Sequence, residues 1–143
     1  MSQQQNAKNH SRYIPLWHIL TPLLILAILT GSIITFIHTD GNLQHASLML
    51  ILVVPVLMLL FWYARWFALR AQDRAIRAEE NFRHFILTGK PLDKQLRMGQ
   101  IIALRFAPDE EMPELAKRAV AEKLSSAQIK QAIKNWKPDY HRV

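Results

Sequence analysis

Residues 16–37 read LWHILTPLLILAILTGSIITFI, and residues 46–67 read ASLMLILVVPVLMLLFWYARWF. No Asp, Glu, Lys or Arg occurs between Tyr13 and Thr39, nor from Gly41 to Ala64. A helix of 22 residues is about 33 Å long, enough to cross the roughly 30 Å hydrocarbon core of a bilayer. We therefore predict two transmembrane helices, at 16–37 and 46–67, which form a hairpin through a short external loop at 38–45.

Basic residues flank this hairpin on one side only. Lys8 and Arg12 precede the first span, within an N-terminal segment at 1–15, whereas Arg65 and Arg70 close the second span. The loop between the spans contains neither Lys nor Arg. Because cytoplasmic segments carry the excess of basic residues, we expect both termini to be cytoplasmic.

The ends of the spans also carry aromatic rings, whose amphipathic character suits the headgroup level of a bilayer. Together with two arginines they form a predicted set of membrane-interface anchors: Tyr13, Trp17, Trp62, Tyr63, Trp66, Arg65 and Arg70. All of them lie on the predicted cytoplasmic side.

The second span has no Gly or Pro between Pro55 and Gly89, which predicts one helix that continues out of the membrane to about Thr88. Along it, small and aromatic residues recur at alternating steps of four and three, the spacing of a helix–helix seam. We take the following residues as a candidate partner interface: Ala64, Ala68, Ala71, Ala75, Ala78, Phe82 and Phe85. Two interpretations are open, because the seam could pack on the later helices of the same chain or on a second copy or partner protein.

Residues 68–143 are predicted to be a cytoplasmic, basic helical module. After a turn at 88–91, we expect one helix from Leu92 or Asp93 to Phe106 and a second that starts near Pro113. Ser125 and Gln128 have the spacing of a capping box, which predicts the start of a third helix. We expect this helix to run past Trp136 and to end at Pro138. The fold class is therefore all-α, with a small bundle after the long helix.

The charge balance points to an anionic surface as a partner. The 143 residues include 18 Lys and Arg against 11 Asp and Glu, a formal charge of +7. Beside a membrane, such a charge is first explained by attraction to anionic headgroups and only second by nucleic acid. Residues 114–133 resemble a helix-turn-helix loosely, with Lys123 in place of the usual turn glycine.

Motifs for catalysis and for metal or cofactor binding are missing. There is no Cys, and the six His are scattered without an H-E-x-x-H spacing. Four glycines cannot supply a phosphate-binding loop. The acids Asp109, Glu110, Glu111 and Glu114 suit the start of a helix, where the dipole favours negative charge. We expect a protein that is not an enzyme and that has no catalytic residue, metal or cofactor.

Four segments resemble a bacterial family of short two-span membrane proteins that carry a domain of unknown function, some of which are labelled transporter permeases. The segments are NHSRYIP at 9–15, AQDRAIR at 71–77, GQIIALRFA at 99–107 and the ending from IKQAIKNW at 129–136 through Arg142 and Val143. The resemblance covers nearly the whole chain from about residue 8. It implies a location in the bacterial cytoplasmic membrane and no catalytic residues.

Taken together, these features favour a membrane-anchored scaffold or accessory subunit that binds a partner, or itself, through its cytoplasmic helices. One alternative is an oligomeric transporter or channel component, in which Thr21, Thr30, Ser32 and Thr35 would line a path. Another, less favoured, is a membrane-tethered nucleic-acid-binding module.

Overall fold

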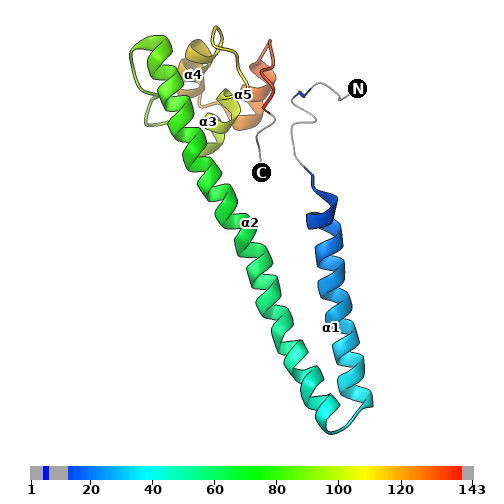
Figure 1. The fold of residues 1–143 in the computed structure, drawn as a ribbon. Helices are drawn as coiled ribbons and strands as arrows, with labels where there is room; N and C mark the ends of the chain where they lie inside the picture. The colour runs from blue at the N-terminus through cyan, green and yellow to red at the C-terminus, as the bar shows by residue number, and fades with distance from the viewer. Residues whose placement is uncertain (1–4, 7–12, 140–143) are drawn as a thin grey trace. The chain divides into compact units, whose positions relative to one another are not determined.

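The computed structural model describes residues 5–6 and 13–139, which contain helices and no strand (Figure 1). The predicted all-α fold is thus confirmed for these residues. A π-helical turn, η1, precedes five α-helices, whose bounds are as follows: η1 Leu16–Leu20, α1 Thr21–His38, α2 Asn42–Thr88, α3 Met98–Leu104, α4 Met112–Ala121 and α5 Ser126–Ala132. The chain divides into two units, residues 13–68 and residues 69–143 together with 1–12, and each is described by itself.

The first unit contains two helical stretches that are long and apolar enough to cross a membrane, Leu16–His38 and the first part of α2. The first of them opens with η1, and Pro22 lies two residues after η1 ends. Proline has no N–H and its ring crowds the carbonyl four residues earlier, so a normal helical turn cannot form there. The backbone N–H of Thr21 instead reaches back five residues to the carbonyl of Leu16, which also accepts the Thr21 hydroxyl at 2.9 Å.

Helix α2 is continuous from Asn42 to Thr88, and this confirms the prediction of one long helix that ends near Thr88. Residues 39–41 alone separate it from α1, so the connection is shorter than the expected loop at 38–45. Glycines at both boundaries adopt positive φ, 64° at Gly41 and 71° at Gly89. Such angles favour glycine at the end of a helix. The Gly89 N–H donates to the Phe85 carbonyl at 2.8 Å, which closes the last turn.

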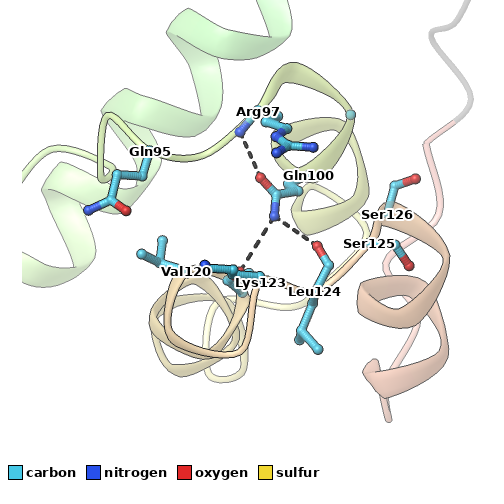
Figure 2. Close-up of a pocket in the computed structure, with 10 residues that line it drawn as sticks. Gln95, Arg97, Gln100, Val120, Lys123, Leu124, Ser125 and Ser126 are labelled. Atoms are coloured by element: carbon cyan, nitrogen blue, oxygen red, sulfur yellow. Dashed lines mark hydrogen bonds between the residues drawn. The ribbon is translucent and has the colours of Figure 1, made fainter.

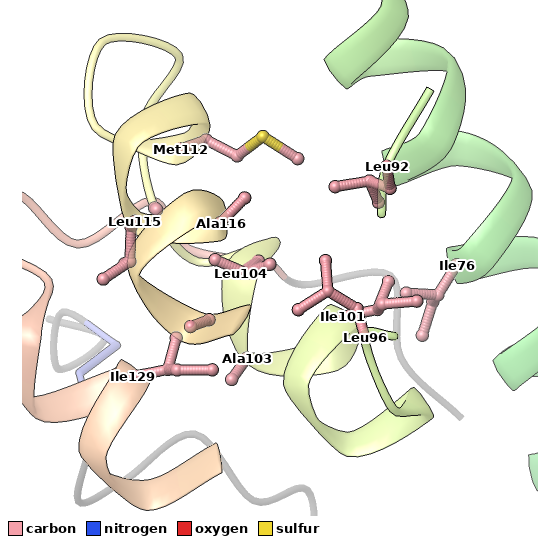
Figure 3. Close-up of a cluster of buried hydrophobic side chains, with 12 residues drawn as sticks. Ile76, Leu92, Leu96, Ile101, Ala103, Leu104, Met112, Leu115, Ala116 and Ile129 are labelled. Atoms are coloured by element: carbon pink, nitrogen blue, oxygen red, sulfur yellow. The ribbon is translucent and has the colours of Figure 1, made fainter. Parts of the chain in front are cut away.

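In the second unit, the three short helices gather at the C-terminal part of α2 around one apolar core (Figure 3). Each helix contributes side chains that are spaced to lie on one face, such as Ile101 and Leu104 from α3 and Met112 and Leu115 from α4. Ile129 of α5 is fully buried in the same core. Of the module predicted at 68–143, residues 89–139 pack beside α2, and from here on these residues alone are called the helical module.

Helix α3 begins later than predicted, because side chains capture the backbone of residues 92–97. The Leu92 N–H donates to Asn81 Oδ1 at 2.9 Å, and the Gln95 N–H donates to Asp93 Oδ1 at 2.8 Å. The prediction of a helix from Leu92 or Asp93 to Phe106 is therefore wrong at both ends, since α3 covers Met98–Leu104. Its apolar residues Leu92 and Phe106 are nevertheless buried as core residues.

Helix α5 has the predicted start but a different end. The Ser125 hydroxyl accepts the Gln128 N–H at 3.3 Å, and Gln128 Oε1 accepts the Ser125 N–H at 2.8 Å, which confirms the capping box. The helix stops at Ala132 instead of continuing past Trp136. The reason is Glu111, whose carboxylate accepts the N–H groups of Lys134 and Asn135 at 2.9 and 3.0 Å and draws this backbone toward α4.

Candidate interaction surface

The predicted seam lies along α2 and is largely uncovered. Within the first unit, Ala64 is exposed and Ala68 is half-buried. Within the second unit, Ala71, Ala75 and Ala78 are exposed. Phe82 and Phe85, which end the seam, are 65% and 51% exposed. Large apolar side chains that stay exposed beside a folded core indicate a surface that binds something.

The helical module packs on the opposite face of α2. Ile76, Glu80 and His84, spaced four residues apart, are each less than a tenth exposed. At about 100° per residue, Glu80 lies roughly 180° around the helix from the centre of the seam. The described part of the module therefore leaves Ala71, Ala75 and Ala78 exposed, and what the seam contacts stays a prediction. The spacing of Ile76, Glu80 and His84 was readable in the sequence, but two of the three are polar and so looked like solvent-facing residues.

Arg83 joins this buried face of α2 to the turn before α4. Its guanidinium contacts the Glu80 carboxylate at 3.0 Å, Asp109 Oδ1 at 2.6 Å and the Ala107 carbonyl at 2.7 Å. A planar fork of donors can serve several acceptors at once, which an ammonium cannot do in the same geometry. The hydrogen bond from Arg83 lowers the pKa of Asp109, against a smaller opposing effect of burial.

The turn after α2 is held by the side chains of the last helical residues. The Thr88 hydroxyl donates to the His84 carbonyl at 2.7 Å, and His84 Nδ1 lies 2.7 Å from the Lys90 carbonyl. Together with the bond from Leu92 N–H to Asn81, these contacts return the chain along α2 toward the core. The exposed end of the seam, at Phe82 and Phe85, thus lies on the last turns of a capped helix.

The aromatic residues predicted as membrane anchors form stacked groups in the first unit. Trp17 stacks on Phe61 with ring centroids 4.4 Å apart, and Tyr63 contacts the rings of both Trp66 and Phe67. The other members of the set are exposed or half-buried: Tyr13, Trp62, Arg65 and Arg70. Their role at a bilayer surface stays a prediction.

The hydroxyl groups expected to line a path are satisfied within their own helical segment. Thr30 donates to the Leu26 carbonyl at 2.9 Å, and Ser32 donates to the Ile28 carbonyl at 2.7 Å. The hydroxyls of Thr21 and Thr35 bond in the same way, to Leu16 and Gly31. A hydroxyl that donates to a carbonyl of the preceding turn has its hydrogen bond satisfied within the helix, which suits apolar surroundings.

A hollow of about 490 Å³ lies between α3 and the turn that joins α4 to α5 (Figure 2). Gln100 crosses it, since its Oε1 accepts the Arg97 N–H at 2.7 Å and its Nε2 donates to the Leu124 carbonyl at 2.8 Å. All the polar atoms of this side chain are thereby used to connect helices. The bond to Leu124 thus holds α3 against the turn that joins α4 to α5.

A groove of about 900 Å³ runs between α2 and residues 90–96. Four basic residues line it, Arg74, Arg77, Lys90 and Lys94, above an apolar floor that includes Leu96. The one acid in the lining, Asp93, is engaged with the N–H of Gln95. The groove therefore favours anionic groups.

A comparison with known protein families finds one family model that matches the whole chain. Residues 1–143 match the model of a family described as a family of unknown function (DUF6526). The chain belongs to this family. The expectation of a family that carries a domain of unknown function is thereby confirmed. Comparisons with curated proteins and with solved structures find no match.

In this member of DUF6526, two acidic residues at the start of α4 bond within the fold. Glu111 accepts N–H groups of Lys134 and Asn135, and these bonds lower the pKa of Glu111, with Lys134 as the first cause. Glu114 lies in the first turn of α4, within 3.9 Å of Lys117. Among the residues that the structure describes, no three of His, Asp and Glu gather in the way that a metal ion requires.

Proposed function

We propose that this DUF6526 protein is a non-enzymatic scaffold or accessory subunit of the bacterial cytoplasmic membrane. Two helices, from α1 and the first part of α2, cross the bilayer as a hairpin. Helix α2 then continues into the cytoplasm, where its seam binds another chain. The helical module covers the other face of α2 and keeps the seam accessible.

The observation that carries this proposal is the contrast between the two units. Large apolar side chains all along the predicted spans are exposed, for example Leu24 at 54% and Leu59 at 58%. At about 25 cal/mol per Å² of apolar surface, exposure of two complete helices to water would cost more than a small domain can offset. Lipid removes this cost, whereas the module buries its own apolar residues in a core.

The orientation follows from the distribution of charge. Lys8 and Arg12, which lie outside the described residues, precede the first span, and Arg65 and Arg70 end the second. Both termini are accordingly cytoplasmic. The basic groove beside α2 adds attraction to anionic headgroups, at about 1 kcal/mol for each basic residue near the surface.

Two other functions have less support. The hydroxyls of the first span bond to their own segment, which speaks against a polar path for a transported solute. In the segment that loosely resembles a helix-turn-helix, Lys130 lies over the Phe106 ring at 5.9 Å, so this lysine packs on the core.

The absence of Cys allows a direct test of the topology. Single variants Asn42→Cys and Ala127→Cys are treated with a membrane-impermeant maleimide in intact cells that express the chain. We expect Asn42→Cys to react from outside, and Ala127→Cys to react only after permeabilisation. Labelling of Ala127→Cys in intact cells would contradict the orientation, and recovery of the chain in the soluble fraction would contradict the anchor.

The scaffold role is tested by the mass and composition of the complex that mild detergent extracts from native membranes. A stoichiometric second protein or a defined homo-oligomer supports it. A protein that is purely monomeric, without a companion, argues against it.

A further inference from the structure

The last turns of α2 carry an apolar face that the described residues of the chain leave exposed. Phe82, Phe85 and Ile86 are exposed by 65%, 51% and 66%. The module is fixed to the other side of the helix by Ile76 and Arg83. A partner can therefore dock on this face without displacing any part of the core.

The spacing of this face specifies what kind of partner it fits. In heptad positions, Ala75 and Phe82 occupy a, while Ala71, Ala78 and Phe85 occupy d. A repeat of 3.5 residues keeps a stripe in contact with a second helix over several turns, whereas packing on a globular surface has no such requirement. The alanines allow close helix axes of about 8 Å, and the phenylalanines require about 10 Å.

The flanking charges fit another copy of α2 as that second helix. Arg74 occupies g and Glu79 occupies the following e, and both are exposed. In a parallel pair of helices, g of one chain faces the next e of the other. Arg74 of each copy thus meets Glu79 of the other, and symmetry provides the contact twice. The remaining flanking positions, Gln72, Asn81, Ile86 and Thr88, carry no like charges that would oppose it.

Neither Arg74 nor Glu79 forms an ion pair within the described part of the chain. An antiparallel pair would place g against g and e against e, which brings like charges to the same flank. The charge pattern therefore favours the parallel arrangement.

We propose that residues 71–86 of α2 pair in parallel with the same residues of a second copy. This inference rests on the proposed function in one respect, because anchoring both copies in one membrane with the same orientation makes the parallel arrangement the accessible one. The inference identifies a second copy of the chain as the partner that the seam binds.

Oxidative cross-linking of the full chain tests the pairing, since the chain has no Cys of its own. We compare Ala78→Cys, at d, with Arg77→Cys, an exposed neighbour at c. We expect a disulfide-linked dimer for Ala78→Cys and little for Arg77→Cys. Equal cross-linking of the two variants, or none in either, would overturn the inference.

Exchange of the charges then tests the register in the Ala78→Cys background. Arg74→Glu alone or Glu79→Arg alone places like charges opposite each other, and each is expected to lower the dimer fraction roughly fivefold. The double variant restores the pair and should recover cross-linking. Single exchanges without effect, or a double variant no better than the singles, would exclude the parallel Arg74–Glu79 register.

Cross-linking is read in whichever fraction holds the chain, so the two proposals fail separately. A chain in the membrane fraction without a dimer rejects self-pairing and leaves the scaffold to another protein. A chain in the soluble fraction rejects the membrane anchor, whatever the cross-linking shows.

Discussion

The indole of Trp136 stacks on the ring of Phe106, with centroids 4.5 Å apart and planes inclined by 16°. The Lys137 N–H also donates to the Phe106 carbonyl at 2.8 Å, so backbone and side chain hold the same contact. Phe106 is fully buried whereas Trp136 is half-buried, and the stack therefore closes the core on the side where the chain leaves α5. The C-terminal segment acts as a lid on the module.

Trp136→Ala removes this lid and should lower the free energy of unfolding of the module by about 3 kcal/mol, near the low end for aromatic truncation because Trp136 is half-buried. Trp136→Phe retains a stacked ring and should cost about 1 kcal/mol. Hydrogen exchange of the α3 amides in the detergent-solubilised chain measures both. Equal protection in the alanine variant and the native chain would contradict a stabilising role for the stack.

Arg83→Met should release α2 from the module. Glu80, which is 8% exposed, would keep a carboxylate without its cation, and the Ala107 carbonyl would lose a donor. We expect the free energy of unfolding of the module to fall by about 2–3 kcal/mol. The ion pair with Asp109 contributes little to this value because Asp109 is well exposed. Hydrogen exchange at residues 76–88 reports it. Arg77→Met, at an exposed position, is the control and should change stability by less than about 0.5 kcal/mol.

Ser125→Ala removes the hydroxyl that accepts the Gln128 N–H, and should destabilise α5 by about 1 kcal/mol. The adjacent Ser126→Ala leaves the cap intact and is the matched control. Amide exchange within α5 distinguishes them, because only the loss of the cap should accelerate exchange in its first turn. Similar rates in the two variants would show that the cap contributes little to this helix.

Glu111 predicts a pH-dependent contribution to stability. Its pKa is lowered from the ordinary value of 4.5 by bonds from the Lys134 and Asn135 N–H groups. The folded state thus prefers the ionised carboxylate, so the contribution is present above about pH 4.5 and is lost as the pH falls through the lowered value. Glu111→Gln should be less stable than the native chain at pH 7, and the difference should narrow below pH 4.5.

The control is Glu110→Gln, the neighbouring exposed carboxyl, which forms no ion pair in the part of the chain that the structure describes. Thermal unfolding followed by circular dichroism at several pH values compares the three chains. A gap between Glu111→Gln and the native chain that stays constant from pH 7 to pH 3.5 would contradict this linkage.

Local chemistry sufficed for much of this protein. A few neighbouring residues predict each of three features, and the corresponding helices occur in the structure. These features are the two charge-free apolar stretches, the end of α2 at Thr88 before Gly89, and the Ser125–Gln128 cap of α5. Such features depend on hydrogen bonds within one or two turns. The repeated spacing of the seam was visible in the same way.

Tertiary contacts decided the rest. Asn81 captures the Leu92 N–H and Glu111 captures those of Lys134 and Asn135, so α3 starts late and α5 ends early. These partners are 11 to 24 residues apart in the chain. Distant partners also set the face that α2 presents to its module, because Arg83 bonds to Asp109 and Ala107, which are 26 and 24 residues away. A long helix has several faces that could be buried, and only the folded position of these distant acceptors selects the face of Ile76 and leaves the seam exposed.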